Sequence, residues 1–343
     1  MSRRTQFVVG LLLAVVLVAW FLRQANLPEV ASLMRETDLR FVAAACFTVV
    51  ITSLQRAWRW RQLLAPLGRF AIRDLWVAIL MGLAVSLLPG RLGEVARPMF
   101  LAQRAPIAAS AGFGSVVLER IFDVIAILLL LAGYLLLAPP PTALSADGAA
   151  TLQILRSLGM ALLAALVGGG ILAVAAARSA SVRRRVDGAV TQFLPARVAR
   201  IVGSFLAGMS GLRSWAATLQ VLVSSIALWG TIVLTYVLLF AAVGIDVPWY
   251  GAIPLLTLLV VGAAVPTPAG VGSFHKVAQL GLVGLFGVAN DAAVAYAIIS
   301  HAVAFLFLGA VGLALLVRAG LAGEVFRDIN RGLAAEEEPP RAV

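Results

Sequence analysis

Long apolar runs separated by charged or Pro/Gly-rich segments set the pattern of this 343-residue chain. A helix needs about 20 mainly apolar residues to cross a bilayer. We interpret six of the apolar runs as spanning helices, at residues 7–22, 39–54, 113–137, 155–177, 216–243 and 291–317. The pattern therefore predicts an all-α, polytopic membrane protein with about six spanning helices.

Two further apolar runs are interrupted by Pro and Gly. In the first, the fourteen residues 75–88 reach only about 21 Å as a helix, less than the hydrocarbon core of about 30 Å. Broken backbone at that depth is tolerated only against protein or in a wet cavity. We predict a re-entrant hairpin at 75–104, entered from the inside, and a second around 265–276, entered from the outside.

Broken segments in corresponding positions of two halves are typical of transporters built from inverted repeats. We expect the two breaks to meet near the membrane midplane and to form one site there. The prolines break the helices, and the glycines permit tight turns and close helix approach. These positions are Pro89, Gly90, Gly93, Pro266, Pro268, Gly270 and Gly272.

Composition supports this class, since 62% of the residues are hydrophobic and 13% are charged. The net charge of +11 comes from arginines in the connections, which indicates cytoplasmic loops near anionic lipid and excludes nucleic acid as a partner. Residues 56–61 read as an inner interface of arginines and belt tryptophans, and 23–40 as an outer loop. We expect one transmembrane domain over 1–320, a disordered tail over 321–343 and cytoplasmic termini.

Charged residues inside apolar surroundings mark the candidate site, because ionisable groups at membrane depth are costly and usually functional. Arg91, Glu94 and Arg97 follow the first break. The guanidinium groups suit a phosphate, and Glu94 would balance them while the site is empty. The alternative is a purely structural ion network.

The helix predicted at 113–137 carries three more charged residues, Glu119, Arg120 and Asp123. Glu119 and Asp123 are four residues apart and share a helix face. We expect these carboxylates to pair with Arg91 or Arg97.

His275 and His301 are the only histidines, and we add them, with the only lysine, Lys276, to the substrate-binding set. The histidines fit a proton-coupling pair or a head-group contact, but also a cap on a backbone carbonyl or a helix interface. Two histidines without a carboxylate pair make a poor metal site. The lone Cys46 excludes a disulfide framework and a thiol-based metal site. We expect no metal or cofactor.

Four motifs carry a resemblance to a known family. They read L-P-G-R-L-G-E-V-A-R-P at 88–98, V-V-L-E-R-I-F-D at 116–123, P-T-P-A-G-V-G-S-F-H at 266–275 and A-I-I-S-H-A at 297–302. With these four motifs in this order, the chain resembles the lysylphosphatidylglycerol synthase transmembrane region family of flippase-like proteins over about residues 7–320. It is most similar to the branch with G-x-F-H and a histidine in the last helix.

The resemblance implies a bacterial or archaeal cytoplasmic-membrane protein. The family's best-known members join a flippase domain for aminoacylated phosphatidylglycerol to a soluble aminoacyl transferase. The sequence contains no such transferase, so we expect no lipid-lysylating activity. Many relatives have Gly-Gly where this chain has Ala269-Gly270, and a Glu near His275, so their substrate does not carry over directly.

We therefore expect a lipid flippase-like transporter, not an enzyme, that moves an anionic or phosphate-linked lipid between leaflets. Two alternatives stay open. One is a membrane phosphatase acting on polyprenyl diphosphates, which would use the same Arg, Glu and His. The other is a non-transporting accessory subunit of a lipid, glycan or hopanoid pathway. A lipid-modifying enzyme or a second copy of the chain is the expected protein partner.

Overall fold

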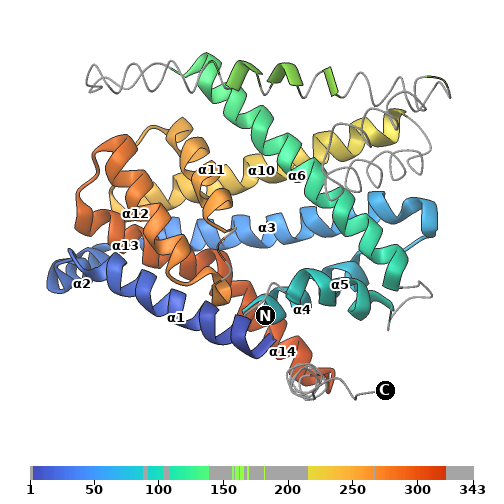
Figure 1. Cartoon of the computed structure of the whole chain (residues 1–343), viewed down its shortest axis with the longest axis horizontal. Coiled ribbons are helices and arrows are strands. Elements are labelled where there is room, and N and C mark those ends of the chain that lie inside the picture. The colour runs from blue at the N-terminus through green and yellow to red at the C-terminus, as the bar shows by residue number, and fades with distance from the viewer. Residues whose placement is uncertain are drawn as a thin grey trace, which may run out of the picture. The chain divides into compact units, whose positions relative to one another are not determined.

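All regular elements in the described part of the chain are helical (Figure 1). The computed structural model describes residues 3–87, 92–102, 109–138, 215–263, 265 and 267–321, with a few single helical positions between 157 and 181. This confirms the predicted all-α fold. Residues 178–213, which join two of the predicted spans, and the predicted tail at 321–343 lie almost wholly outside the described residues.

Four of the described helices are long and apolar enough to cross a membrane. They are α3 (Leu39–Leu64, extended by the short η1, Ala65–Leu67), α6 (Ala109–Leu137), α10 (Trp215–Val243) and the run from Asn290 to Arg318. A fifth candidate is α1 (Arg3–Leu22) taken with the helix that follows it. These match five of the six predicted spans. The sixth, at 155–177, lies mostly outside the described residues.

The predicted outer loop at 23–40 is wrong in one respect, because it contains a helix. This helix, α2 (Leu27–Glu36), is bent by 86° from α1. Pro28 lies in its first turn, where a missing N–H costs nothing, and Glu29 and Arg35 suit the helix dipole. The backbone N of Asn26 donates to Oδ1 of Asp291 over 2.9 Å, which ties α2 to the helix that it packs against, α13 (Asn290–His301).

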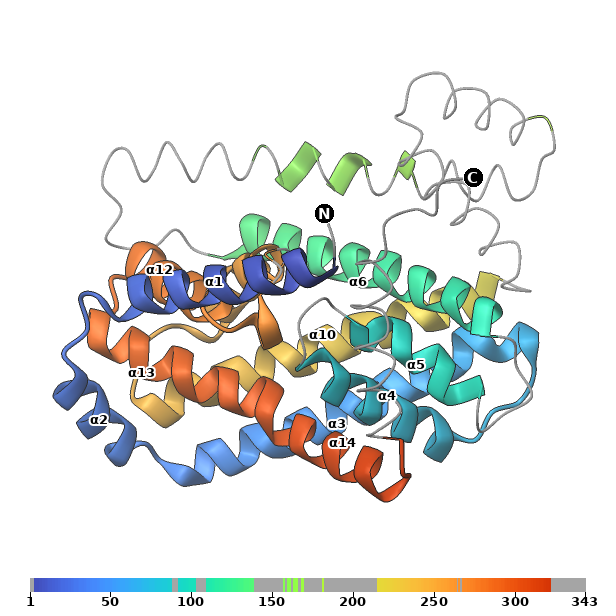
Figure 2. The same cartoon turned by 60° about the horizontal axis from the view of Figure 1, so that its bottom comes forward.

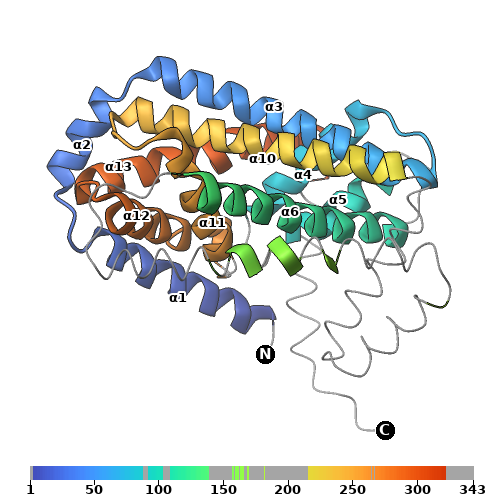
Figure 3. The same ribbon diagram turned by 90° about the horizontal axis from the view of Figure 1, so that it is seen from above.

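The described residues divide into two compact units. The first comprises Met1–Leu54, Arg73–Arg104 and Thr231–Val343, and the second comprises Gln55–Ile72 and Ala105–Gly230. Helices α3 and α10, which run side by side in Figure 3, each contribute one end to each unit. Within the first unit the hydroxyls of Thr48 and Thr235 join them by a hydrogen bond of 2.8 Å.

The first predicted hairpin is a pair of short helices, α4 (Ile72–Ser86) and α5 (Leu92–Ala102). Their backbones nearly touch: a Cβ on Gly93 would lie 2.1 Å from the carbonyl oxygen of Gly82. Gly93 is thus a residue of close helix approach. Pro89, Gly90 and Arg91 lie outside the described residues, so the meeting of the two breaks stays a prediction.

The second predicted hairpin consists of α11 (Ala252–Gly262) and α12 (Ser273–Phe286), which pack against each other. The short η3 (Pro268–Gly270) lies between them. Ala269 has a φ of 50°, which is unusual for a residue with a Cβ, and Gly272 has a φ of 83°. Pro266 lies outside the described residues.

Helix α12 lies at the centre of the C-terminal part of the first unit. It packs against α1, α11 and α13, and Figure 2 shows α1 running along it. Helix α13 continues through a π-helical segment, η4 (Ala302–Leu306), into α14 (Phe307–Arg318). Helix α14 packs closely on α4, since a Cβ on Gly312 would lie 1.9 Å from the carbonyl oxygen of Leu80.

Candidate functional site

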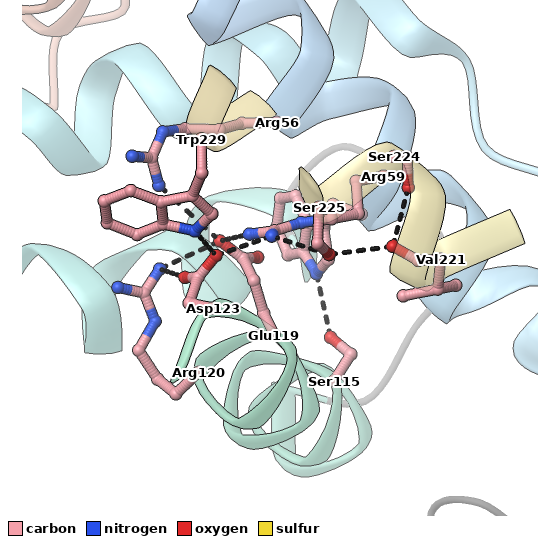
Figure 4. Close-up of polar contacts among 11 residues, drawn as sticks. Arg56, Arg59, Ser115, Glu119, Arg120, Asp123, Val221, Ser224, Ser225 and Trp229 are labelled. Carbon is pink, nitrogen blue, oxygen red and sulfur yellow. Dashed lines mark hydrogen bonds and ion pairs between the residues drawn. The ribbon is translucent and has the colours of Figure 1, made fainter. Parts of the chain in front are cut away.

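A buried cluster of charged side chains lies in the second unit, where α3, α6 and α10 meet (Figure 4). Its members share helical spacings that place them on common faces, three residues apart on α3 and four apart on α10. They are Arg56 and Arg59 from α3, Glu119, Arg120 and Asp123 from α6, and Ser225 and Trp229 from α10.

Arg59 lies at the centre of the cluster and has no exposed surface. Its Nη1 lies 2.5 Å from Oδ1 of Asp123 and 3.1 Å from Oγ of Ser225. Its Nη2 lies 3.2 Å from Oε1 of Glu119. One guanidinium therefore contacts two buried carboxylates, an arrangement that offsets the cost of removing all three charges from water.

The two carboxylates have further partners. The indole Nε1 of Trp229 donates to Oδ1 of Asp123 over 2.9 Å. Nη2 of Arg120 lies 2.9 Å from Oε1 of Glu119 and 3.2 Å from Oδ2 of Asp123. Nη1 of Arg56 lies 4.0 Å from the same oxygen of Glu119. Figure 4 shows all three arginines directed toward the two carboxylates.

The arginines of the cluster differ in how far they are buried. In its described part three guanidinium groups lie around two carboxylates. The side chain of Arg59 is wholly buried, whereas those of Arg56 and Arg120 are 26% and 39% exposed. Arg56 and Arg120 are therefore the arginines of the cluster that an incoming group can reach.

Neutral hydrogen bonds fix the helices around the cluster. The indole of Trp60 donates to Oγ of Ser115 over 2.8 Å, and that hydroxyl donates to the carbonyl of Gly112. On the other side, Oγ of Ser224 donates to Oε1 of Gln62 over 3.1 Å. A small apolar core of Leu63, Leu118, Phe122 and Val221 packs beside them. These contacts hold α3, α6 and α10 in register.

Sequence reasoning found the α6 residues but missed their principal partner. Residues 56–61 were predicted to form an interfacial belt, and for Arg59 and Trp60 this is wrong, because both are fully buried. Trp58 is exposed and lies under Arg61 with 4.3 Å between the guanidinium carbon and the ring centre, as a belt residue would. The three-residue spacing of Arg56 and Arg59 was the available signal.

The residues after the first break are only partly described. Arg91 and the side chain of Glu94 lie outside the described residues. Arg97 is buried on α5 in the first unit, where its Cγ occupies the place that a Cβ on Gly82 would take. The predicted pairing of the α6 carboxylates with Arg91 or Arg97 stays a prediction.

The two histidines meet in the first unit, with 4.5 Å between their ring centres. Nε2 of His301 lies 2.9 Å from the carbonyl oxygen of Ala269, the residue with the positive φ. Phe274 packs edge-on against both imidazoles. His301 thus contacts a backbone carbonyl, which is one of the roles predicted for the histidines. Among the described residues no group of three His, Cys, Asp or Glu could hold a metal ion.

Comparison with known proteins agrees with this architecture. The chain is 28% identical to a protein named glycosyltransferase AglD from Haloferax volcanii, over 91% of this chain and 54% of that protein. It thus spans about half the length of the curated relative that it matches. The profile of the lysylphosphatidylglycerol synthase TM region matches residues 7–312. The chain therefore belongs to the lysylphosphatidylglycerol synthase transmembrane region family.

Proposed function

We propose that this multi-pass membrane protein is a flippase-like transporter that moves an anionic, phosphate-linked lipid between the leaflets of the cytoplasmic membrane. The observation that carries the proposal is the gathering of three arginines around two carboxylates, with Arg56 and Arg120 partly exposed. Partly buried guanidinium groups attract an anion more strongly than exposed ones, because their surroundings screen charge weakly.

The donors of Arg56 and Arg120 favour a phosphodiester as the ligand. Such a group carries one negative charge and oxygens that accept hydrogen bonds from both guanidinium groups. Both arginines are partly exposed and present planar forks of donors that match phosphate oxygens. Arg59 remains with the carboxylates and keeps the site assembled while it is empty. In this proposal Arg56 and Arg120 bind the head group and Arg59 positions the site.

The helices that carry the cluster also suit lipid tails. Large apolar side chains are exposed on α6, at Val117 and Val124, and on α10, at Leu219 and Val223. Within a membrane these side chains would face acyl chains, which are as apolar as they are. A charged head-group site on apolar helices is the arrangement that a lipid with an anionic head group requires.

A second candidate function follows from the relative in Haloferax volcanii. The chain matches about half of a protein named as a glycosyltransferase. This favours, as the alternative, an accessory role in which the membrane domain presents a lipid-linked substrate to a separate or fused enzyme. In neither case do we propose chemistry by the chain itself. Cytoplasmic termini remain part of the proposal.

Reconstitution separates the two candidates. The purified chain is placed in phosphatidylcholine vesicles containing fluorescent phosphatidylglycerol or, in parallel, fluorescent phosphatidylcholine. Chemical quenching from outside then reports how fast the inner-leaflet label becomes accessible. We expect faster exchange of phosphatidylglycerol than of phosphatidylcholine. Exchange no faster than in protein-free vesicles, for every anionic lipid tried, would contradict transport and favour the accessory role.

A further inference from the structure

Lys276 is a buried cation of the first unit, outside the arginine cluster. Lys276 is in the first turn of α12 and is 7% exposed. Its Nζ donates to Oε1 of Gln279 over 2.7 Å and lies 4.4 Å from the ring centre of Trp20 on α1. Both partners are neutral. The ammonium is therefore held between an amide and an indole face.

The surroundings supply Lys276 with no counter-ion among the described residues. No acid lies in the first turn of α12. The helices that pack most closely on α12 are α1, α11 and α13, and their sequences contain a single acid, Asp291. Oδ1 of Asp291 accepts the backbone N–H of Asn26. Within the described part of the chain, no carboxylate forms an ion pair with Nζ.

This placement is unfavourable for a cation by itself. Burial removes the ammonium from water, and the amino end of a helix repels positive charge. The indole face offsets only a part of this cost. The effect of the helix end changes sign for a bound anion, which the ammonium and the amino end of α12 attract together. The environment of Lys276 thus favours an ammonium that is neutralised by a ligand.

The neighbouring amides hold the ammonium in place. Nε2 of Gln279 donates to Oδ1 of Asn290 over 2.7 Å and to the carbonyl oxygen of Phe21 over 3.3 Å. Nδ2 of Asn290 in turn donates to the carbonyl oxygen of Gln24. The carbonyl oxygen of Gln279 is therefore committed to Lys276. An ammonium has three donors, of which Gln279 takes one, so donors remain for a ligand.

We propose that Lys276 and Trp20 form a second anion site, which holds the phosphate of an anionic phospholipid at the edge of the contact between α1 and α12. Trp20 is 50% exposed, and α1 exposes the apolar side chains of Leu12, Val15 and Val16. An apolar helix surface next to the phosphate site suits a lipid better than a free ion. The site goes beyond the proposed function, since a lipid can bind here whether or not the arginine cluster transports one.

Retention of lipid by the purified full chain tests the site. The chain is exchanged into detergent with phosphatidylglycerol, phosphatidylcholine or inorganic phosphate, and bound molecules are counted by native mass spectrometry across a concentration series. Lys276→Gln removes the charge, Lys276→Arg keeps it, and Arg318→Gln is the matched control because Arg318 is exposed at the end of α14. Thermal unfolding and gel filtration verify that each variant is folded.

We expect wild type, Lys276→Arg and Arg318→Gln to bind phosphatidylglycerol alike, and Lys276→Gln to bind it about tenfold more weakly or worse, as for loss of one charge-assisted hydrogen bond. If inorganic phosphate binds with the same dependence on Lys276, the site takes the free anion. Equal binding of phosphatidylglycerol by folded Lys276→Gln and wild type would overturn the proposal. Arg120→Gln should leave binding of phosphatidylglycerol at Lys276 unchanged. A failure of the Lys276 proposal can therefore be distinguished from a failure of the transport proposal.

Discussion

Arg59 in the second unit and Lys276 in the first are both buried cations, but they are balanced in different ways. Arg59 contacts two carboxylates, Glu119 and Asp123, whereas Lys276 contacts an amide and an indole. The first cation is compensated within the protein, and the second depends on a group from outside. The role of a buried charge therefore depends on its partners. Arg59 holds the residues of the arginine cluster in place, whereas Lys276 binds the ligand itself in our proposal.

Removing an internal counter-ion should produce the largest effect on stability. Asp123→Asn keeps the shape of the side chain and leaves Arg59 with only Glu119. Loss of one partner of a buried ion pair costs about 3–5 kcal/mol, and we expect the lower end because Glu119 remains. The free energy of unfolding of the purified protein, measured by denaturant titration in detergent, checks this value.

Ser225→Ala is the matched control on the other side of Arg59. It removes a neutral hydroxyl that accepts a hydrogen bond from the same Nη1. Its expected cost is about 1 kcal/mol. If the two substitutions cost the same, the carboxylate is not balancing the charge of Arg59, and the contrast with Lys276 fails.

Much of the fold is predictable from sequence because the length of an apolar run and a Pro/Gly break within it are local signals. Neither depends on which distant helix packs nearby. Five spans and both broken helix pairs follow from such local signals. The α2 helix was missed because residues 23–40 were interpreted only as the outer loop between two apolar runs. Its signals, Pro28, Glu29 and Arg35 at the helix ends, were present in the sequence.

The candidate site is less predictable, because pairing between distant helices leaves a weaker mark on sequence. Glu119 and Asp123 were found from their spacing on one helix. Their partner Arg59 was not, because the run Q-R-A-W-R-W-R resembles a membrane-interface belt. Only the packing of α3 against α6 shows which of its arginines faces inward. Trp229 was missed for the same reason.

Disruption of the close contact between α4 and α5 in the first unit should have the next largest effect on stability. A Cβ on Gly93 would lie 1.9 Å from Oγ of Ser86 and 2.1 Å from the carbonyl oxygen of Gly82. Gly93→Ala should therefore separate α4 from α5 and displace Arg97, at a cost of about 1–3 kcal/mol. The free energy of unfolding of the purified protein measures this cost.

Gly284→Ala serves as the control for that substitution. Gly284 is exposed in α12, and a Cβ there meets no atom within 4 Å. Alanine should stabilise the helix by about 0.5–1 kcal/mol relative to glycine. Similar unfolding midpoints for the two variants would show that α4 and α5 are not in close contact.

An exposed ion pair should have the smallest effect. Asp38 and Arg40 are 2.7 Å apart at the start of α3, and the hydrogen bond from Arg40 lowers the pKa of Asp38 below 3.8. Since the folded pKa is the lower one, the stabilisation is complete above the unfolded value and is lost as pH falls through the folded value. Asp38→Asn should leave the unfolding midpoint at neutral pH unchanged within error. A shift as large as that of Asp123→Asn would contradict the distinction between exposed and buried pairs.

The most direct test of the central claim, that the partly exposed arginines of the cluster select an anionic head group, is the ratio of phosphatidylglycerol to phosphatidylcholine exchange rates in vesicles. Arg120→Gln removes one positive charge that an incoming group can reach, and gel filtration verifies that the variant is folded. Wild type should prefer phosphatidylglycerol, and the variant should lose that preference by about tenfold or more. An unchanged ratio in the folded variant would contradict the claim.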